Sequence, residues 1–242
     1  INRPQVYNAV HPPLSLELDQ VWNEFIEDSE QWVAVLTGAG DKAFSAGNDL
    51  KYSAQPGKYK VQQPKSGFAG LTNRFDRTKP IIAAVNGFAM GGGMETALSC
   101  DIILASENAK FALPEVKVGF FAAAGGVQRL SRQIGKKAAL EMILTGRSVD
   151  AKEALKLGIV NDVFSQSELL DKAIEKAKVI AGNCPSSIKY SLEALNHMDQ
   201  LEEMSSALEK SYELIDLLRQ TEDHKEGVSA FVEKRAPQWK NK

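Results

Sequence analysis

Hydrophobic residues occur in short continuous runs in the first half of the chain and mainly at helical spacing in the last third. The clearest run, Ile81 to Val85, has the length and composition of a strand that is buried on both faces. Other short apolar runs predict further strands at residues 32–36, 102–105, 110–113 and 159–164. Strands that alternate with helices are typical of α/β proteins.

Helical spacing of apolar residues predicts a helix from Leu14 to Ile26, with Ser15 as its N-cap, and a short helix from Leu71 to Arg77. Another helix opens at about Gly126, and further helices are predicted at residues 136–144, 151–157, 167–181, 185–196, 201–219 and 222–234. We therefore expect an α/β core at residues 1–183 and a helical region at residues 184–242 that makes the contacts of an oligomer.

The Ile81–Val85 run leads into a glycine-rich segment. Asn86-Gly87 is a turn signal, and Gly91 to Gly93 precede residues with the composition of a helix. The first N–H groups of a helix lack intrahelical partners, and glycine lets a ligand approach them closely. Alone, the pattern is that of a tight strand-to-helix connection. It is not a nucleotide-binding loop, because Gly93-Met94 stands where Lys-Ser/Thr is required. If the segment is part of a catalytic site, its backbone N–H groups are predicted to be hydrogen-bond donors to an oxyanion.

Composition excludes several classes of protein. The 242-residue chain is 43% hydrophobic and 25% charged with a net charge of −2, so it has no general attraction for nucleic acid or acidic membranes. Cys100 and Cys184 lack the spacing of metal ligands, and we expect no metal site. No apolar run reaches membrane-spanning length and no signal peptide is visible. We expect a cytoplasmic protein, or one of an organelle matrix if a targeting segment precedes Ile1.

Four pieces of the sequence combine into a candidate catalytic constellation. Glu95 would lie in the first turn of a helix, Glu115 follows a proline, Asn48-Asp49 follows a glycine, and Gly92 lies in the glycine-rich segment. Singly, each is explained by helix capping, solvation or a turn. Together they supply a base, a proton donor and two backbone donors. Those groups are needed to add or remove water beside a thioester carbonyl.

The chain resembles the crotonase family, the enoyl-CoA hydratases and isomerases. The segments that carry the resemblance are FSAGNDL (44–50), IIAAVNGFAMGGGMETALSCDI (81–102), PEVKVG (114–119), AGGVQRL (124–130) and AFVEKR (230–235). The resemblance implies repeated ββα turns and a C-terminal helical region that forms trimers, two of which often stack into a hexamer. It also implies acyl-CoA substrates, with coenzyme A as the carrier and no separate cofactor.

The resemblance also implies roles for individual residues. The N–H groups of Asn48 and Gly92 would hold the thioester oxygen. Glu95, as a carboxylate, would activate water for attack at C3, and protonated Glu115 would deliver a proton to C2. The other residues implied to contact the substrate or its coenzyme A are Ala46, Asp49, Leu50, Lys51, Ala123 and, from a neighbouring subunit, Phe231 and Lys234.

Four further segments resemble the carnitinyl-CoA dehydratase branch of this family, which hydrates crotonobetainyl-CoA. They are GFAGLT (67–72), FALPE (111–115), SQSELLD (165–171) and EGVSAFVEKRAPQW (226–239). The chain departs from many hydratases just before the paired glycines Gly125-Gly126. Where those relatives have Pro-Gly, this chain has alanines, and Ala123 would narrow the pocket beside the reacting carbons. The departure bears on the acyl group rather than on the type of reaction.

Three alternatives remain open at this point. A double-bond isomerase would use one glutamate to move a proton between carbons, whereas the presence of both Glu95 and Glu115 favours hydration. Some crotonase relatives bind RNA, but the slightly acidic balance here lacks the basic stripe that RNA binding needs. A non-catalytic oligomer that kept the fold would have no need to retain both glutamates and the glycines.

Overall fold

Strand β3 (Ile81–Val85) is buried along its whole length, as the sequence predicts. In the computed structural model it lies in a four-stranded sheet with the order β1 (Ala34–Thr37), β3, β5 (Ile102–Ser106), β8 (Asp162–Phe164). A second sheet has the order β2 (Ala43–Ser45), β4 (Phe88–Met90), β6 (Lys110–Ala112), β7 (Ser148–Asp150). In the first sheet, β5 runs parallel to β3 and to β8. In the second sheet, β4 runs parallel to β2 and to β6, and β7 is antiparallel to β6.

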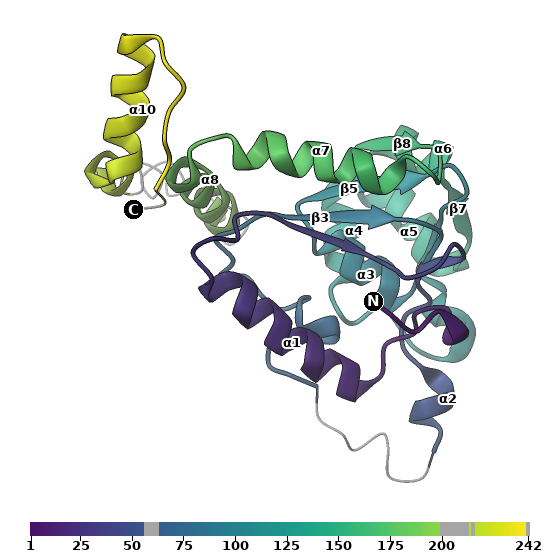
Figure 1. Cartoon of the computed structure of the whole chain (residues 1–242). Coiled ribbons are helices and arrows are strands. Elements are labelled where there is room, and N and C mark those ends of the chain that lie inside the picture. Colours follow the sequence, from purple (N-terminus) through teal and green to yellow (C-terminus); the bar gives the residue numbers. More distant parts are fainter. Residues whose placement is uncertain (56–62, 199–212, 214–215, 241–242) are drawn as a thin grey trace. The chain divides into compact units, whose positions relative to one another are not determined.

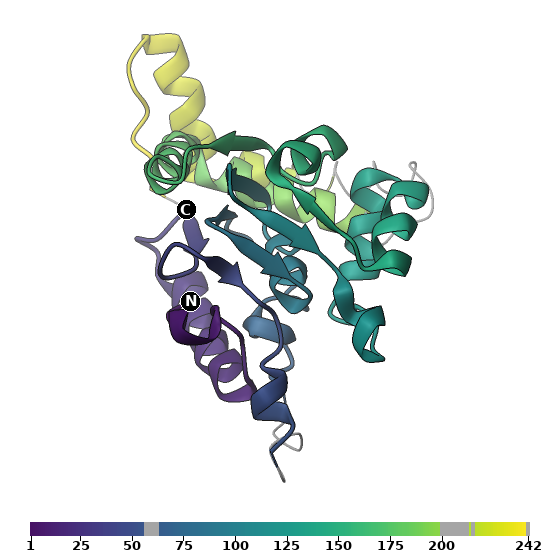
Figure 2. The same ribbon diagram turned by 90° about the vertical axis from the view of Figure 1, so that its right-hand side faces the viewer.

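The chain passes between the two sheets at each turn of the fold. β1 is followed by β2, β3 by β4, and β5 by β6, so each turn contributes one strand to each sheet. After β4 the chain enters α3 (Gly92–Leu98), all of which is buried. α3 contacts α4 (Gly126–Ile134), and α4 contacts α5 (Lys136–Thr145). Figure 1 shows β3 and β5 side by side with α3 and α4 near them, and Figure 2 shows the same strands after a 90° turn.

The structure describes residues 1–55, 63–198, 213 and 216–240. These fall into two units, one made of Ile1–Glu24, Val35–Arg74 and Ile81–Glu175, and the other of Phe25–Ala34, Phe75–Pro80 and Lys176–Lys242. The remaining helices are α1 (Pro12–Glu27), α2 (Leu50–Ser53), α6 (Ala151–Leu157), α7 (Leu169–Ala181), α8 (Pro185–Met198) and α10 (Glu222–Glu233). None of the helices in these described stretches is long and apolar enough to cross a lipid bilayer.

The second unit is held by a buried carboxylate on α10. One oxygen of Asp223 accepts a hydrogen bond from the hydroxyl of Ser186 on α8 (2.9 Å), and the other accepts from the backbone N–H of Lys240 (2.7 Å). The indole N–H of Trp239 donates to the carbonyl of Gly182 (2.9 Å). These bonds tie the segment after α10 to the start of α8 and to α10 itself. The helix predicted at 201–219 lies largely outside the described residues, so its subunit contacts stay a prediction.

Two local predictions were wrong. α1 begins at Pro12 rather than at an N-cap Ser15, and the buried Ser15 hydroxyl instead accepts a hydrogen bond from the N–H of Ala69 (3.2 Å). No helix forms at 71–77. The hydroxyl of Thr72 accepts from the N–H of Phe68 (2.9 Å), and the N–H of Asn73 donates to the Ser66 carbonyl (2.8 Å). These bonds close the backbone into turns, which is how threonine and asparagine compete with helix formation.

Strands β2, β4 and β7, each of three residues, were not predicted. The equally short β6 and β8 lie within the predicted runs 110–113 and 159–164, whereas β4 lies in the segment that was assigned to a glycine-rich turn. The other predicted strands and the helices described from Gly126 onward are confirmed within a few residues at their ends. The chain is therefore an α/β protein whose last third is mainly helical.

Asn86, at the turn between β3 and β4, offers a test of this framework. Its buried amide donates to the carbonyls of Gly38 and Gly40 (both 2.8 Å), which anchors the loop after β1. We expect Asn86→Ala to lower the free energy of unfolding by about 1–3 kcal/mol, because the buried carbonyl of Gly38 loses its donor and the carbonyl of the exposed Gly40 loses its tether. Urea denaturation measures the change. The exposed Asn23→Ala on α1 is the control, and an equal effect of both substitutions would contradict the anchoring role.

Candidate active site

Three loops meet at one edge of the second sheet. The loop with Asn48 follows β2, Gly91 and Gly92 follow β4, and Pro114 and Glu115 follow β6. These three strands are parallel neighbours, so their carboxyl ends lie at the same edge. In α/β sheets, that edge is where ligands bind. Sheet topology therefore brings together the four pieces that the sequence singled out.

A cavity of about 540 Å³ lies at this edge. Its polar side chains include the two carboxyl groups of Glu95 and Glu115. Most of the other lining residues are apolar or small, among them Phe68, Phe120, Phe121, Val118, Leu50, Ala46, Ala123, Ala124, Gly91 and Gly92. A largely apolar cavity with a few convergent polar groups is typical of a small-molecule site.

Two backbone N–H groups at the cavity lack hydrogen-bond partners among the described residues. Gly92 is the first residue of α3, where the N–H has no partner within the helix. The N–H of Asn48 also makes no bond, although its neighbours Gly47 and Asp49 bond to Val10 on either side. A Cβ on Gly92 would lie 2.6 Å from Cε1 of Phe68, so the aromatic ring packs directly on the glycine backbone.

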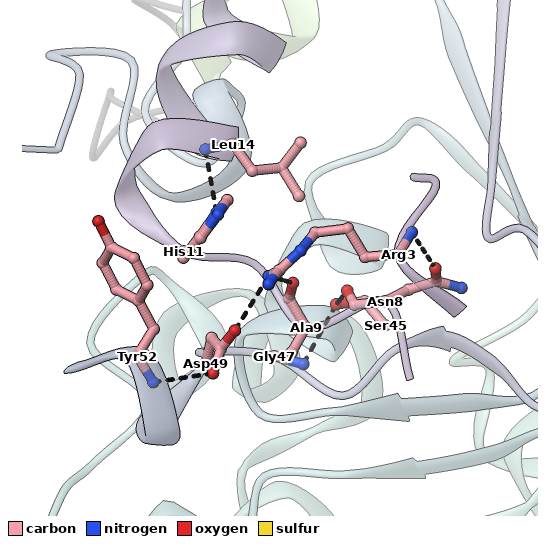
Figure 3. Close-up of polar contacts among 9 residues, drawn as sticks. All are labelled: Arg3, Asn8, Ala9, His11, Leu14, Ser45, Gly47, Asp49 and Tyr52. Carbon is pink, nitrogen blue, oxygen red and sulfur yellow. Dashed lines mark hydrogen bonds and ion pairs between the residues drawn. The ribbon is translucent and has the colours of Figure 1, made fainter. Parts of the chain in front are cut away.

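The loop that carries Asn48 is held by Asp49, whose carboxylate is buried (Figure 3). One oxygen of Asp49 pairs with the guanidinium of Arg3 (3.0 Å), which also donates to the Ala9 carbonyl (2.7 Å). The other oxygen accepts from the N–H of Tyr52 (3.0 Å) and caps α2. Asp49 is not among the residues that line the cavity, so its contacts position the loop instead.

Glu95 lies in the first turn of α3 and is almost fully buried. One of its oxygens accepts a hydrogen bond from the N–H of Gly126 (2.9 Å) at the start of α4. The pKa of Glu95 is raised to about 7, mainly by burial and to a smaller extent by the nearby Glu115. The N–H groups of Gly126 and Ala124 and the charge of Arg129 lower that pKa. The carboxyl group is thus poised to exchange a proton near neutral pH.

Glu115 lies in a 3-10 helix at Pro114–Val118, and burial raises the pKa of its carboxyl group as well. Its Oε2 atom is buried and has no hydrogen-bond partner among the described residues. Gly91 has a φ of +53°, and a Cβ there would lie 2.7 Å from Oε1 of Glu115. Glycine at this position therefore serves both the backbone conformation and the close approach of the carboxyl group.

The remaining predicted contact residues divide into three groups. Ala46, Leu50 and Ala123 line the cavity. Lys51 is exposed on α2 and is not among the lining residues. Lys234 is exposed after α10 in the second unit, and the side chain of Phe231 lies outside the described part of the structure.

The sequence reasoning missed Phe68 and the role of Gly126. Phe68 packs against the buried cluster of Val10, Leu14 and Ala69, and it is far in sequence from the two glutamates. The sequence predicts Gly126 only as the start of a helix. Because the free N–H groups at a helix start attract carboxylates, that position could have indicated a carboxylate partner. Among the described residues, no group of three or more His, Cys, Asp or Glu side chains is placed to hold a metal ion.

Comparison with known proteins adds an independent line of support. The whole chain, residues 1–242, matches the family model described as enoyl-CoA hydratase/isomerase. Carnitinyl-CoA dehydratase of Proteus mirabilis is 40% identical over 250 residues, which cover 100% of this chain and 94% of that protein. Carnitinyl-CoA dehydratase of Salmonella typhi is 42% identical over 248 residues, with the same coverage.

Solved structures give the same result for the fold. Enoyl-CoA hydratase from Bacillus anthracis superposes with a TM-score of 0.91 at 36% identity, covering 99% of this chain and 93% of that one. Enoyl-CoA hydratase from Mycobacterium tuberculosis also superposes with a TM-score of 0.91, at 33% identity, with coverage of 99% and 93%. The predicted crotonase-like fold is confirmed, and the chain belongs to the enoyl-CoA hydratase/isomerase family.

Proposed function

We propose that the protein adds water to, or removes it from, the C2–C3 bond of an acyl-CoA thioester through Glu95 and Glu115. Its full-length relatives are hydratases and dehydratases of such thioesters, and they support this activity. The observation that carries the assignment of residues is that the buried carboxyl group of Glu95, the half-buried one of Glu115 and two backbone N–H groups without partners among the described residues face one cavity. Coenzyme A is the carrier of the substrate, and the reaction requires no other cofactor.

In this proposal the N–H groups of Asn48 and Gly92 hold the thioester oxygen. Negative charge develops on that oxygen as the C2–C3 bond gains or loses water. Backbone donors that are already in place stabilise this charge without reorganisation, and each contributes on the order of 3 kcal/mol. The helix dipole of α3 adds to the effect, because Gly92 lies at its positive end.

The surroundings of the two glutamates support different roles for them. The carboxylate of Glu95 receives the N–H of Gly126, which favours its ionised form. Glu115 has a buried oxygen with no donor among the described residues, which favours its protonated form. Glu95 then acts as the base that activates water for attack at C3, and Glu115 as the acid that protonates C2. In the dehydration direction the two groups exchange these roles.

The acyl group we propose first is that of carnitinyl-CoA or its dehydrated form, crotonobetainyl-CoA, because several relatives bear the first of these names. Its trimethylammonium group can interact with aromatic faces, and Phe68, Phe120 and Phe121 line the cavity. Crotonyl-CoA, which lacks the ammonium group, is the comparison substrate. A higher kcat/KM for crotonyl-CoA would count against this acyl group while leaving the reaction type in place.

Substitution of the two glutamates tests the reaction directly. We expect Glu95→Gln and Glu115→Gln each to lower kcat by about 10²–10⁴-fold, because glutamine can neither accept nor release the proton. The exposed Glu107→Gln is the matched control. Loss of the conjugated enoyl absorbance gives the rate, and mass analysis in ¹⁸O-labelled water locates the added oxygen. Label at C3 supports hydration, whereas an unlabelled product with a migrated double bond would identify an isomerase.

A bulkier residue at position 92 tests the oxyanion site. We expect Gly92→Val to reduce kcat/KM by about 10²–10³-fold, because its side chain would collide with Phe68 and cover the N–H group. Gly182→Val is the control, since a Cβ there meets nothing closer than 3.4 Å. Circular dichroism checks that both variants are folded. A folded Gly92→Val enzyme with a normal rate would exclude this N–H group as a donor.

We also propose that the protein is a trimer or hexamer assembled through residues 184–242, with residues 1–183 as the acyl-CoA-binding core. Large apolar side chains of this C-terminal region, such as Leu195 and Val228, are exposed in the single chain, as at subunit contacts. In this assembly Lys51, with Phe231 and Lys234 of a neighbouring copy, would contact the nucleotide end of coenzyme A. Analytical ultracentrifugation should give three or six times 26.4 kDa, and a monomer at micromolar concentration would contradict the assembly.

A further inference from the structure

Arg129, on the first turn of α4, bridges two separate loops. One guanidinium nitrogen donates to the Thr72 carbonyl (2.7 Å), and another donates to the Ala124 carbonyl (3.3 Å). The two carbonyls are far apart in sequence and belong to loops on either side of the same side chain. The guanidinium suits this bridge, because its planar fork carries donors on separate nitrogens that point in fixed directions.

Each of these loops carries part of the cavity wall. The Thr72 hydroxyl accepts the N–H of Phe68 (2.9 Å), so this loop sets the position of the ring that packs on Gly92. Ala124 lines the cavity itself. Two residues later, the N–H of Gly126 donates to the Glu95 carboxyl group (2.9 Å). Arg129 therefore connects the aromatic wall to the segment that binds the proposed base.

The glycine at position 125 leaves room for the guanidinium of Arg129. Gly125 has a φ of +98°, a conformation that side chains of L-residues rarely adopt, and a Cβ there would collide with Nη1 of Arg129. The glycine thus lets the guanidinium lie against the turn that opens α4. The charge of Arg129 also lowers the pKa of Glu95, in opposition to burial, which raises it. Arginine keeps its charge throughout the working pH range.

We propose that Arg129 is a positioning residue for the hydration reaction, which fixes the two cavity walls relative to each other and places a positive charge near Glu95. It acts through Glu95 and touches no reacting atom. The proposal rests on the role of Glu95 as the base in the proposed function. It adds to that function a reason why an arginine follows the paired glycines by three residues.

The pH dependence of kcat/KM separates this role from a merely structural one. The acidic limb of that profile reports the ionisation of the base in the free enzyme. Removing a positive charge raises the pKa of a nearby carboxyl group, so Arg129→Met should move the acidic limb of the profile to higher pH. Its plateau should also fall. Arg129→Lys keeps the positive charge but lacks the forked guanidinium. The acidic limb of its pH profile should therefore stay near that of the wild type, while its maximal kcat/KM falls.

Arg132→Met is the matched control, because Arg132 is an exposed arginine on the same helix. It should leave both limb and plateau unchanged. If Arg129→Met lowers the plateau without moving the limb, or behaves like Arg132→Met, the proposal is overturned. If Arg129→Met fails to fold, Arg129→Lys decides, and a wild-type plateau in that variant overturns the bridging role. An active Glu95→Gln enzyme would instead refute the proposed function, so the two failures are distinguishable.

Discussion

The parallel pairing of β2, β4 and β6 is the constraint on which the candidate site depends. The register places Ser45 opposite Ala89, and Met90 opposite Ala112. Because each of these strands has only three residues, the chain leaves the sheet at once, and the loops that follow begin at the same edge. Asn48, Gly92 and Glu115 therefore meet although they are distant in sequence. A strand shifted by one residue would turn its side chains to the opposite face and displace its loop.

Glycines permit the approach that this pairing demands. A Cβ on Gly47 would lie 2.5 Å from the Met90 carbonyl and 2.8 Å from the Gly92 nitrogen, so the loop after β2 lies against the start of α3. Gly93 lies as closely against the backbone of Ser45. These contacts bring the N–H groups of Asn48 and Gly92 to one side of the cavity. Any larger side chain at these glycines would separate the two donors.

Opposed electrostatic effects govern the two glutamates. Burial in a largely apolar cavity raises the pKa of both carboxyl groups, which disfavours their ionisation. For Glu95, the N–H groups of Gly126 and Ala124 and the charge of Arg129 act in the opposite sense. For Glu115, a hydrogen bond from its own backbone N–H acts in that sense. The difference between the two environments is what would allow one acid and one base to coexist near neutral pH.

The sequence by itself determined the α/β class, most of the longer helices, the buried strand Ile81–Val85 and the family. Composition and periodicity are local properties, and the whole chain matches the family model. Only the tertiary structure decided which groups surround those motifs. Strands β2, β4 and β7 left no recognisable pattern in the sequence. Phe68 reaches the cavity, and Thr72 and Arg129 bond to the segments that form its walls, through contacts across the fold. Such contacts depend on the pairing of distant strands, which no local pattern records.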